Sequence, residues 1–143
     1  MTPEEAARTI LQHFWHRHLP VRPIDIAGKL GISVFESVDP HLIGFDRTAR
    51  RIVIDRGLPP TQKRYSIAYQ LGRYVMNIED MERDFKRKEL KVNLFCLELL
   101  IPSEALRVLV QDRKLKFDAL CKEFDVPRQA MMLRLSQQNL VTQ

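Results

Sequence analysis

The sequence is short of the features that mark several special classes of protein. No apolar run comes near the roughly 20 residues that a membrane-spanning helix requires. Only two cysteines occur, Cys96 and Cys121, and both fall inside helical patterns without the paired spacing of a disulfide framework or a metal site. The five glycines are scattered, so no glycine-rich phosphate loop is present. We therefore expect one globular domain over residues 1–143, with both cysteines reduced.

A strong excess of charge of one sign is also missing. The net charge is +5, from 23 basic and 18 acidic residues. Residues 1–80 carry 11 basic and 9 acidic side chains and residues 81–143 carry 12 and 9, so neither part is a polyelectrolyte arm. This charge permits nucleic-acid binding but does not demand it. The N-terminus, Met-Thr-Pro-Glu-Glu, lacks the basic and apolar stretches of an export signal and predicts a cytoplasmic protein without membrane attachment.

The hydrophobic pattern predicts a mostly helical α+β domain with a small three-stranded antiparallel sheet. Residues 32–36 predict one strand, and residues 42–46 and 51–55 predict a hairpin. Thr2 is the expected cap of the first helix, and Pro3 occupies its first turn. The segment 81–88 is charged and predicts a loop or a frayed turn. Helices are predicted over residues 3–17, 24–30, 61–77, 90–101, a short segment from 103, 115–124 and 127–136.

One segment carries most of the functional information. Residues 64–77 read Arg-Tyr-Ser-Ile-Ala-Tyr-Gln-Leu-Gly-Arg-Tyr-Val-Met-Asn. This segment resembles the active-site helix of the ImmA/IrrE-type zinc metallopeptidases, in which the pattern is roughly R-F-T-[LI]-A-H-E-L-G-H-x-x-x-H. The packing residues of the pattern are present. Its chemical residues are replaced, by Tyr69, Gln70, Arg73 and Asn77.

Three further segments resemble the same family, in the same order along the chain. Residues 21–34 (VRPIDIAGKLGISV) resemble its opening pattern V-D-P-x-x-I-A-x-x-L-G-I-x-V. Residues 92–102 (VNLFCLELLIP) resemble A-N-x-F-A-x-x-L-L-M-P, and residues 120–135 resemble the closing L-A-x-x-F-x-V-S-x-x-A-x-x-x-R-L. Four segments in register are fairly specific, and the resemblance implies a zincin-like domain over nearly the whole chain.

The replaced residues are those that the family needs for its chemistry. In H-E-x-x-H, two histidines four positions apart share one helix face and bind Zn²⁺, and the glutamate acts as general base. Here Tyr69 is neutral and is rarely a ligand. Arg73 is permanently cationic and repels a divalent metal. Gln70 keeps the shape of glutamate but cannot accept a proton.

The third ligand position completes this loss. The resemblance places an acidic ligand just ahead of the A-N pair, where this chain has Lys91, with Glu89 two residues earlier. At most one ligand survives, so the resemblance implies a pseudo-metallopeptidase with no catalytic residue, no metal and no cofactor. We expect Arg73 to occupy the zinc position and to pair with Glu89 across the cleft. Arg73 and Lys91 would then make the vacated cleft cationic and suited to an anionic group.

Protein binding is the function that this reading favours. Zincins hold an extended peptide along the edge of their sheet, which is a form of strand addition. Arg51-Ile52-Val53-Ile54 is the strongest strand signal, and we expect it to be the edge strand that contacts a partner. Because the family cleaves or binds helix-turn-helix repressors, the resemblance implies an inactive regulatory module. It would bind such a repressor of a phage or mobile element, as an antirepressor does.

Two other functions stay open. One is a hydrolase with a displaced metal site, because His13, His16 and His18 cluster ahead of Pro20. No acidic or cysteine partner is near these histidines in the sequence. The alternative is a structural role without metal, in which the histidines lie at a half-exposed helix end where the helix dipole stabilises cations.

The other open function is that of a DNA-binding transcriptional regulator. Residues 115–124 and 127–136 resemble the body of a helix-turn-helix, with a short turn at Asp125-Val126. The start of the second helix offers only Arg128 and Gln129 for contacts with bases. Nucleic acid is therefore the less favoured partner.

Overall fold

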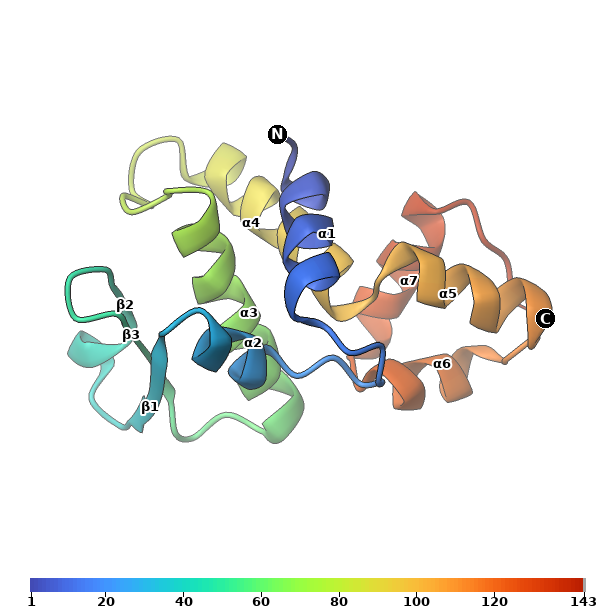
Figure 1. Cartoon of the computed structure of the whole chain (residues 1–143), viewed down its shortest axis with the longest axis horizontal. Coiled ribbons are helices and arrows are strands. Elements are labelled where there is room, and N and C mark those ends of the chain that lie inside the picture. Colours follow the sequence, from blue (N-terminus) through green and yellow to red (C-terminus); the bar gives the residue numbers. More distant parts are fainter. Residues whose placement is uncertain (143) are drawn as a thin grey trace.

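Helices dominate the fold, as the hydrophobic pattern predicts. The computed structural model describes residues 1–142. Its elements in chain order are α1 (Pro3–Phe14), α2 (Pro23–Lys29), β1 (Ser33–Ser37), the 3₁₀ helix η1 (Pro40–Leu42), β2 (Gly44–Asp46), β3 (Arg51–Asp55), α3 (Pro60–Val75), α4 (Phe85–Leu100), α5 (Ser103–Arg107), the π-helix η2 (Val108–Asp112), α6 (Phe117–Phe124) and α7 (Arg128–Gln137). The sheet lies at one end of the molecule, and α5, α6 and α7 lie together at the other (Figure 1).

The first helix begins as its sequence predicts and ends earlier. The Thr2 hydroxyl accepts the Glu5 N–H at 3.1 Å, and the Thr2 N–H donates to the Glu5 carboxylate at 2.8 Å, which is a capping box. The helix was expected to reach Arg17 but stops at Phe14, because Trp15 turns to an extended conformation. The Trp15 indole N–H then donates to the His18 carbonyl at 2.9 Å and holds the turn that follows.

The fourth helix starts one turn before its apolar pattern does. The prediction placed its start at Leu90, whereas α4 begins at Phe85 and includes the second half of the charged segment expected as a loop. The backbone N–H of Lys88 donates to the Asp84 carbonyl at 3.0 Å, so this first turn is regular. Lysine, arginine and glutamate are good helix formers, and a solvated turn made of them leaves no apolar periodicity to detect.

The sheet is mixed, with strand order β1-β3-β2. β2 and β3 form the predicted antiparallel hairpin, with Gly44 opposite Val53. β1 runs parallel to β3, with Ser33 opposite Arg51. The expectation of a purely antiparallel sheet was therefore wrong. β2 pairs with the side of β3 that faces away from β1. Because β2 runs antiparallel to both of the other strands, β3 runs in the same direction as β1.

The strand predicted to be an edge is the central one. β3 is paired with β1 over its whole length and with β2 over Arg51–Val53, so the assignment of residues 51–54 as an edge strand was wrong. Ile52 and Ile54 are 0% and 2% exposed. Strong alternation marks a strand with one well-buried face, and such a pattern does not say which strand lies in the middle. The edges of this sheet are β1 and β2.

The core positions α3 against both the sheet and α4. Ala68 and Leu71 of α3 are buried, as are Val92 and Phe95 of α4. Gly72 is the point of closest approach, because a Cβ there would lie 2.9 Å from Cδ1 of Phe95. The two helices therefore meet at a distance that only glycine allows. No helix among the described residues is long and apolar enough to cross a bilayer.

Candidate functional site

Arg73 turns back onto the end of its own helix. Its Nε donates to the Ile78 carbonyl at 3.1 Å, and Nη1 donates to the Gln70 side-chain oxygen at 3.3 Å. Nη2 donates to the Glu79 carbonyl. Within residues 1–142 no ion pair joins this guanidinium to Glu89, so the predicted bridge across the cleft is not formed. The carbonyls that follow α3 already occupy the donors that would make it.

Asn77, at the position of the family's trailing histidine, has a local structural role. It adopts a left-handed conformation (φ 56°) just after the end of α3. The N–H of Ile78 donates to the Arg73 carbonyl at 2.8 Å, and the N–H of Asn77 donates to the Tyr74 carbonyl at 3.2 Å. These two bonds form a Schellman motif, in which asparagine is the usual alternative to glycine. Asn77 is exposed and reverses the chain.

Two tyrosines of α3 face α4 inside the site. The Tyr65 hydroxyl donates to the Asn93 side-chain oxygen. Burial raises the pKa of Tyr65, and the neighbouring Cys96 adds to that shift. Burial is also the largest cause of the raised pKa of Tyr69. The negative charge of Glu89 raises this pKa further, and the positive charge of Arg73 lowers it. Both phenols therefore stay neutral over the physiological range, and neither is a ready metal ligand or base.

Cys96 lies beneath this pair of tyrosines. Its side chain is fully buried, and burial raises the pKa of the thiol well above its ordinary value, against a smaller opposite effect of Tyr65. Since the thiolate is the form that attacks electrophiles and binds metals, this cysteine is inert. It behaves as the small buried side chain that its place in the sequence predicts.

Lys91 does not line the site. It is exposed, and it lies two residues from both Glu89 and Asn93, which places it on the opposite side of α4 from them. The expectation that Arg73 and Lys91 together make the cleft cationic was therefore wrong for Lys91. The charge of Glu89 contributes to the raised pKa of Tyr69. The site therefore contains the Arg73 guanidinium and the Glu89 carboxylate in addition to the phenols of Tyr65 and Tyr69.

The residues present do not suit a zinc ion. Among the described residues, no group of three or more histidine, cysteine, aspartate or glutamate side chains is placed to hold a metal. The predicted histidine cluster forms no such group. His13 Nδ1 lies 2.8 Å from the Thr9 carbonyl, and His16 Nε2 lies 2.6 Å from the Lys29 ammonium. These are exposed contacts at and just after the end of α1, which agrees with a structural role for these histidines.

Two cavities border α3 at its two ends. The one at its C-terminal end has a volume of about 370 Å³ and is lined by residues of β2 and its turn and by Arg73, Ile78 and Glu79. The other, of about 450 Å³, lies where the first turns of α3 meet α4 and α7, and it is mostly apolar. Tyr69 lies on the stretch of α3 between these two ends. The structure thus has a recess on either side of Tyr69 along α3.

The free edge beside the first cavity is β2. The Ser33 N–H donates to the Arg50 carbonyl, so alternate amides of β3 point to β1 and those of Arg51 and Val53 point to β2. Phe45, opposite Ile52, therefore directs its own N–H and C=O away from the sheet. The Phe45 ring lies 5.0 Å from that of Tyr74 on α3. An extended segment could pair with this one outward amide group.

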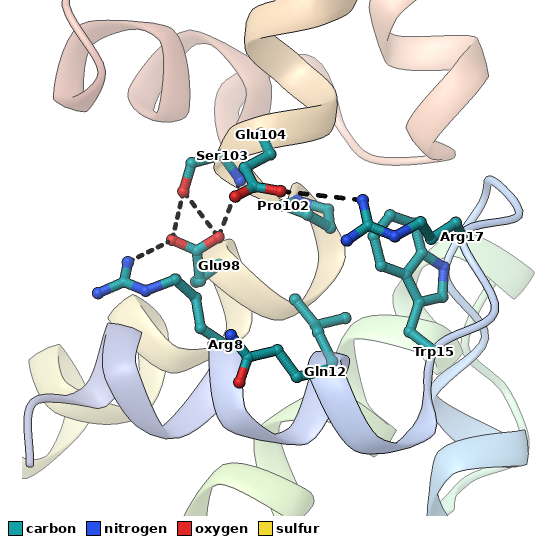
Figure 2. Close-up of a pocket in the computed structure, with 9 residues that line it drawn as sticks. Arg8, Gln12, Trp15, Arg17, Glu98, Pro102, Ser103 and Glu104 are labelled. Atoms are coloured by element: carbon teal, nitrogen blue, oxygen red, sulfur yellow. Dashed lines mark hydrogen bonds and ion pairs between the residues drawn. The ribbon is translucent and has the colours of Figure 1, made fainter.

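A second polar cluster on α4 was missed by sequence reasoning. Glu98 is 1% exposed and Arg134 is 2% exposed, and their side chains pair at 2.8 Å. The carboxylate also receives Arg8 at 3.1 Å and the N–H of Ser103 at 2.8 Å (Figure 2). The Arg134 Nε donates to the Ile101 carbonyl at 2.9 Å. A lone glutamate in the apolar run of α4 was the available signal, because a buried carboxylate requires partners.

This buried cluster joins four helices rather than forming a reactive site. Arg8 comes from α1, Glu98 from α4, Ser103 from the start of α5 and Arg134 from α7. A cavity of about 140 Å³ adjoins it, with Trp15 on one wall and the Arg17–Glu104 ion pair (3.8 Å) across it (Figure 2). Because every charge of the cluster is paired, it stabilises the packing of these helices.

The C-terminal helices offer a poor surface for reading bases. Arg128 pairs with Asp118, and its guanidinium lies 4.7 Å over the Phe117 ring, so one of the two expected base-contacting side chains is engaged. Met132 and Leu133 are 60% and 52% exposed on α7. Base edges in the major groove are read chiefly by hydrogen-bonding side chains. The helix-turn-helix resemblance therefore reflects packing of α6 on α7.

Residues 27–136 match the family model described as the IrrE N-terminal-like domain. The chain belongs to this family. A comparison with solved structures finds a transcriptional regulator of Mycobacterium tuberculosis, with a TM-score of 0.68 and 20% sequence identity. The match covers 94% of this IrrE N-terminal-like domain and 46% of the regulator's chain, so the domain spans about half the length of that protein. The comparison with curated proteins gave no match.

Proposed function

We propose that this IrrE N-terminal-like domain is a catalytically inactive regulatory module that binds a protein partner. The partner is a helix-turn-helix repressor of a phage or mobile element, which the domain shields as an antirepressor does. The observation that carries this proposal is the position of the Arg73 side chain and the hydrogen bonds that hold it. A permanent cation stands at a ligand position and is held there by the Ile78 and Glu79 carbonyls and by Gln70.

The chemistry of the site supports the absence of hydrolysis. A catalytic zinc needs three protein ligands and a general base for its water. Tyr69 and Arg73 stand where the family has histidines, and Gln70 stands where it has the base. Burial and the charge of Glu89 raise the pKa of Tyr69, which keeps the phenol protonated. Glu89 alone does not hold a metal.

The geometry of the scaffold supports binding. A cavity remains at each end of α3, and the β2 edge presents one outward amide group next to the first of them. An inactive zincin can use the same recesses to grip a segment without cutting it. The structural similarity to a transcriptional regulator, which by itself concerns the fold, agrees with a role in regulation.

The test combines binding, cleavage and metal content. The purified chain is mixed with purified helix-turn-helix repressors of phages or mobile elements, tested one by one, with and without a chelator. We expect a stoichiometric complex by size-exclusion chromatography with light scattering, and intact repressor on a denaturing gel in both conditions. Chelator-sensitive cleavage of the repressor would show an active hydrolase and refute the proposal. A salt-dependent gel shift on upstream DNA, without repressor binding, would favour the DNA-binding alternative.

A matched variant examines the vacated site itself. Tyr69→His, Gln70→Glu and Arg73→His are combined to rebuild the pattern of the family, and zinc is measured by plasma emission after dialysis. We expect the native chain to retain no stoichiometric zinc and the rebuilt chain to gain it, with Glu89 as the third ligand. Equal zinc content in the native chain would contradict the assignment of an inactive site.

A further inference from the structure

We propose that the groove between α4, the start of α3 and α7 binds an acidic amphipathic helix of the partner. This inference rests on the proposed function and specifies which part of the partner is held. The mostly apolar cavity of about 450 Å³ forms one end of this groove. Its apolar wall comes from four segments of the chain: Leu58, Tyr65, Leu97, Pro127, Ala130 and Leu133.

An exposed apolar stripe extends the groove along α4. Leu90 lies seven residues before Leu97, which is two helical turns, so both lie on the same face. Leu90 is 59% exposed, Leu94 between them is half-buried, and Leu97 reaches the cavity wall. From Leu90 to Leu97 the stripe is about 10 Å long at roughly 1.5 Å per residue, which corresponds to about two turns of a bound helix.

Cations border the exposed part of this stripe. Lys86 and Arg87 are exposed one turn before Leu90, and Lys91 is exposed next to Leu90 on the side of α4 away from Asn93. None of the three forms an ion pair with another described residue. Other cations near the site are engaged, since Arg47 pairs with Glu79 and Arg73 binds backbone carbonyls. Free cations beside an apolar stripe complement a helix whose leucine face is flanked by acidic residues.

The apolar component favours a helix over nucleic acid. Leu133 is 52% exposed and lines the cavity together with Leu97, and Leu90 is 59% exposed two turns before Leu97 on the same face of α4. Phosphates would neutralise the nearby lysines but would leave these leucines in water. A helix that buries leucines at positions i, i+4 and i+7 covers them, which is the helix-in-groove mode of recognition. The partner's segment is therefore amphipathic and acidic.

The probe is a fluorescein-labelled helical peptide of about 18 residues, with leucines at i, i+4, i+7 and i+11 and glutamates on both sides of that stripe. A second peptide carries lysines in place of the glutamates. Binding is measured by fluorescence anisotropy at low and at physiological salt. We expect the acidic peptide to bind the native chain and the basic peptide to bind at least tenfold more weakly, with the difference reduced by salt.

Matched variants locate the contact. Leu133→Glu places a charge in the groove, and Met132→Glu changes an equally exposed neighbour on α7 that does not line it. We expect Leu133→Glu to weaken the acidic peptide at least tenfold and Met132→Glu to leave it unchanged. Lys86→Glu combined with Lys91→Glu should weaken it several-fold. Circular dichroism and urea unfolding check that each variant is folded.

Three results would overturn the inference. Equal affinity of Leu133→Glu and Met132→Glu would place the peptide elsewhere. Equal affinity for the acidic and basic peptides would remove the role of the cations. Binding of a duplex DNA of about 20 base pairs in place of the peptide, lost on charge reversal at Lys86 and Lys91, would assign the surface to nucleic acid.

The repressor assay separates this inference from the proposed function. If the repressor binds the native chain and Leu133→Glu equally well, the groove is not its docking site, while the module still binds its partner. If the acidic peptide binds in the groove and the repressor does not bind at all, the groove is real and the proposed partner is wrong.

Discussion

The two ends of α4 carry two polar clusters with opposite properties. At its C-terminal end, Glu98 and Arg134 are almost completely buried and fully paired. At its N-terminal end, Glu89 lies near Tyr69 and Arg73, all of which are partly exposed. Within residues 1–142 no buried side-chain nitrogen or oxygen lacks a partner. The first cluster meets this demand through fixed ion pairs, and the second meets it through backbone carbonyls and solvent.

This difference explains why the two clusters tolerate substitution to different degrees. The buried cluster holds α1, α4, α5 and α7 together, and removing either Glu98 or Arg134 leaves the other charge without its buried partner. The other cluster tolerates a change of side chain at Tyr69 or Arg73, because water and nearby carbonyls satisfy the new polar group. We therefore expect substitutions at Tyr69 and Arg73 to destabilise the fold less than substitutions at Glu98.

Breaking the buried cluster is expected to have the largest effect. Arg134→Met removes the buried partner of Glu98 and leaves its carboxylate with Arg8 and Ser103 alone. We expect a loss of about 3–5 kcal/mol in the free energy of unfolding. Urea denaturation followed by circular dichroism measures it. The double variant Glu98→Gln/Arg134→Met should recover part of the loss. A loss below about 1 kcal/mol in Arg134→Met would show that the pair is not essential to the core.

A methyl group between α3 and α4 is expected to have the next largest effect. Gly72→Ala would place a Cβ 2.9 Å from Phe95 Cδ1, in a wall of two buried helices. We expect a loss of about 1–3 kcal/mol from overpacking, measured by urea unfolding. Gly28→Ala is the matched control, because a Cβ at Gly28 meets nothing within 4 Å. An equal effect of both substitutions would mean that helix propensity, and not the contact with Phe95, decides the outcome.

Removing the Arg73 guanidinium should lower the free energy of unfolding less than either change above. Arg73→Gln gives up bonds to the Ile78 and Glu79 carbonyls at a partly exposed position, where water replaces them. We expect a loss of about 1 kcal/mol or less by the same denaturation assay. The comparison between the two clusters fails if this loss equals that of Arg134→Met. In that case Arg73 would be as important to the fold as the buried pair.

The alkaline limb of stability tests the phenols and should show the smallest effect. The pKa of Tyr69 is raised in the folded chain, by burial first and by Glu89 second. Below the ordinary tyrosine pKa of about 10, Tyr69 is protonated in both the folded and the unfolded chain, so its ionisation does not reduce the free energy of unfolding. Above it, the unfolded chain loses its proton first, so the stability falls as the pH rises. Urea midpoints at pH 9 and pH 11 should fall less in Tyr69→Phe than in the native chain, and an identical fall would contradict the burial of this phenol.

Much of the fold follows from the sequence, with clear exceptions. The Thr2 cap of α1, the β2–β3 hairpin and the α3 helix were predicted from local signals, and the structure confirms them. The parallel pairing of β1 with β3 was not predicted, because strand order depends on contacts between segments that local periodicity does not record. The same limit produced the wrong placement of residues 51–54 at the edge.

The site was predicted in its residues more than in its contacts. The helix that carries Tyr69, Gln70 and Arg73 was identified, and the family is shown. The direction of the Arg73 side chain was not predictable, because it depends on carbonyls in the loop after α3. Lys91 was assigned to the cleft from its number alone, although two residues along a helix reverse the direction of a side chain.

The shortness of β2 also bears on aggregation. An open sheet edge can template the addition of further copies of a chain, and proteins limit this with short or obstructed edges. β2 has three residues and turns a single amide group outward, at Phe45. On the opposite edge, the Arg56 guanidinium occupies the Glu36 carbonyl at 3.2 Å. The β2 edge therefore offers no run of free amides, and the β1 edge has one outward carbonyl already bonded, which limits the addition of further copies to a sheet whose Phe35 is 54% exposed.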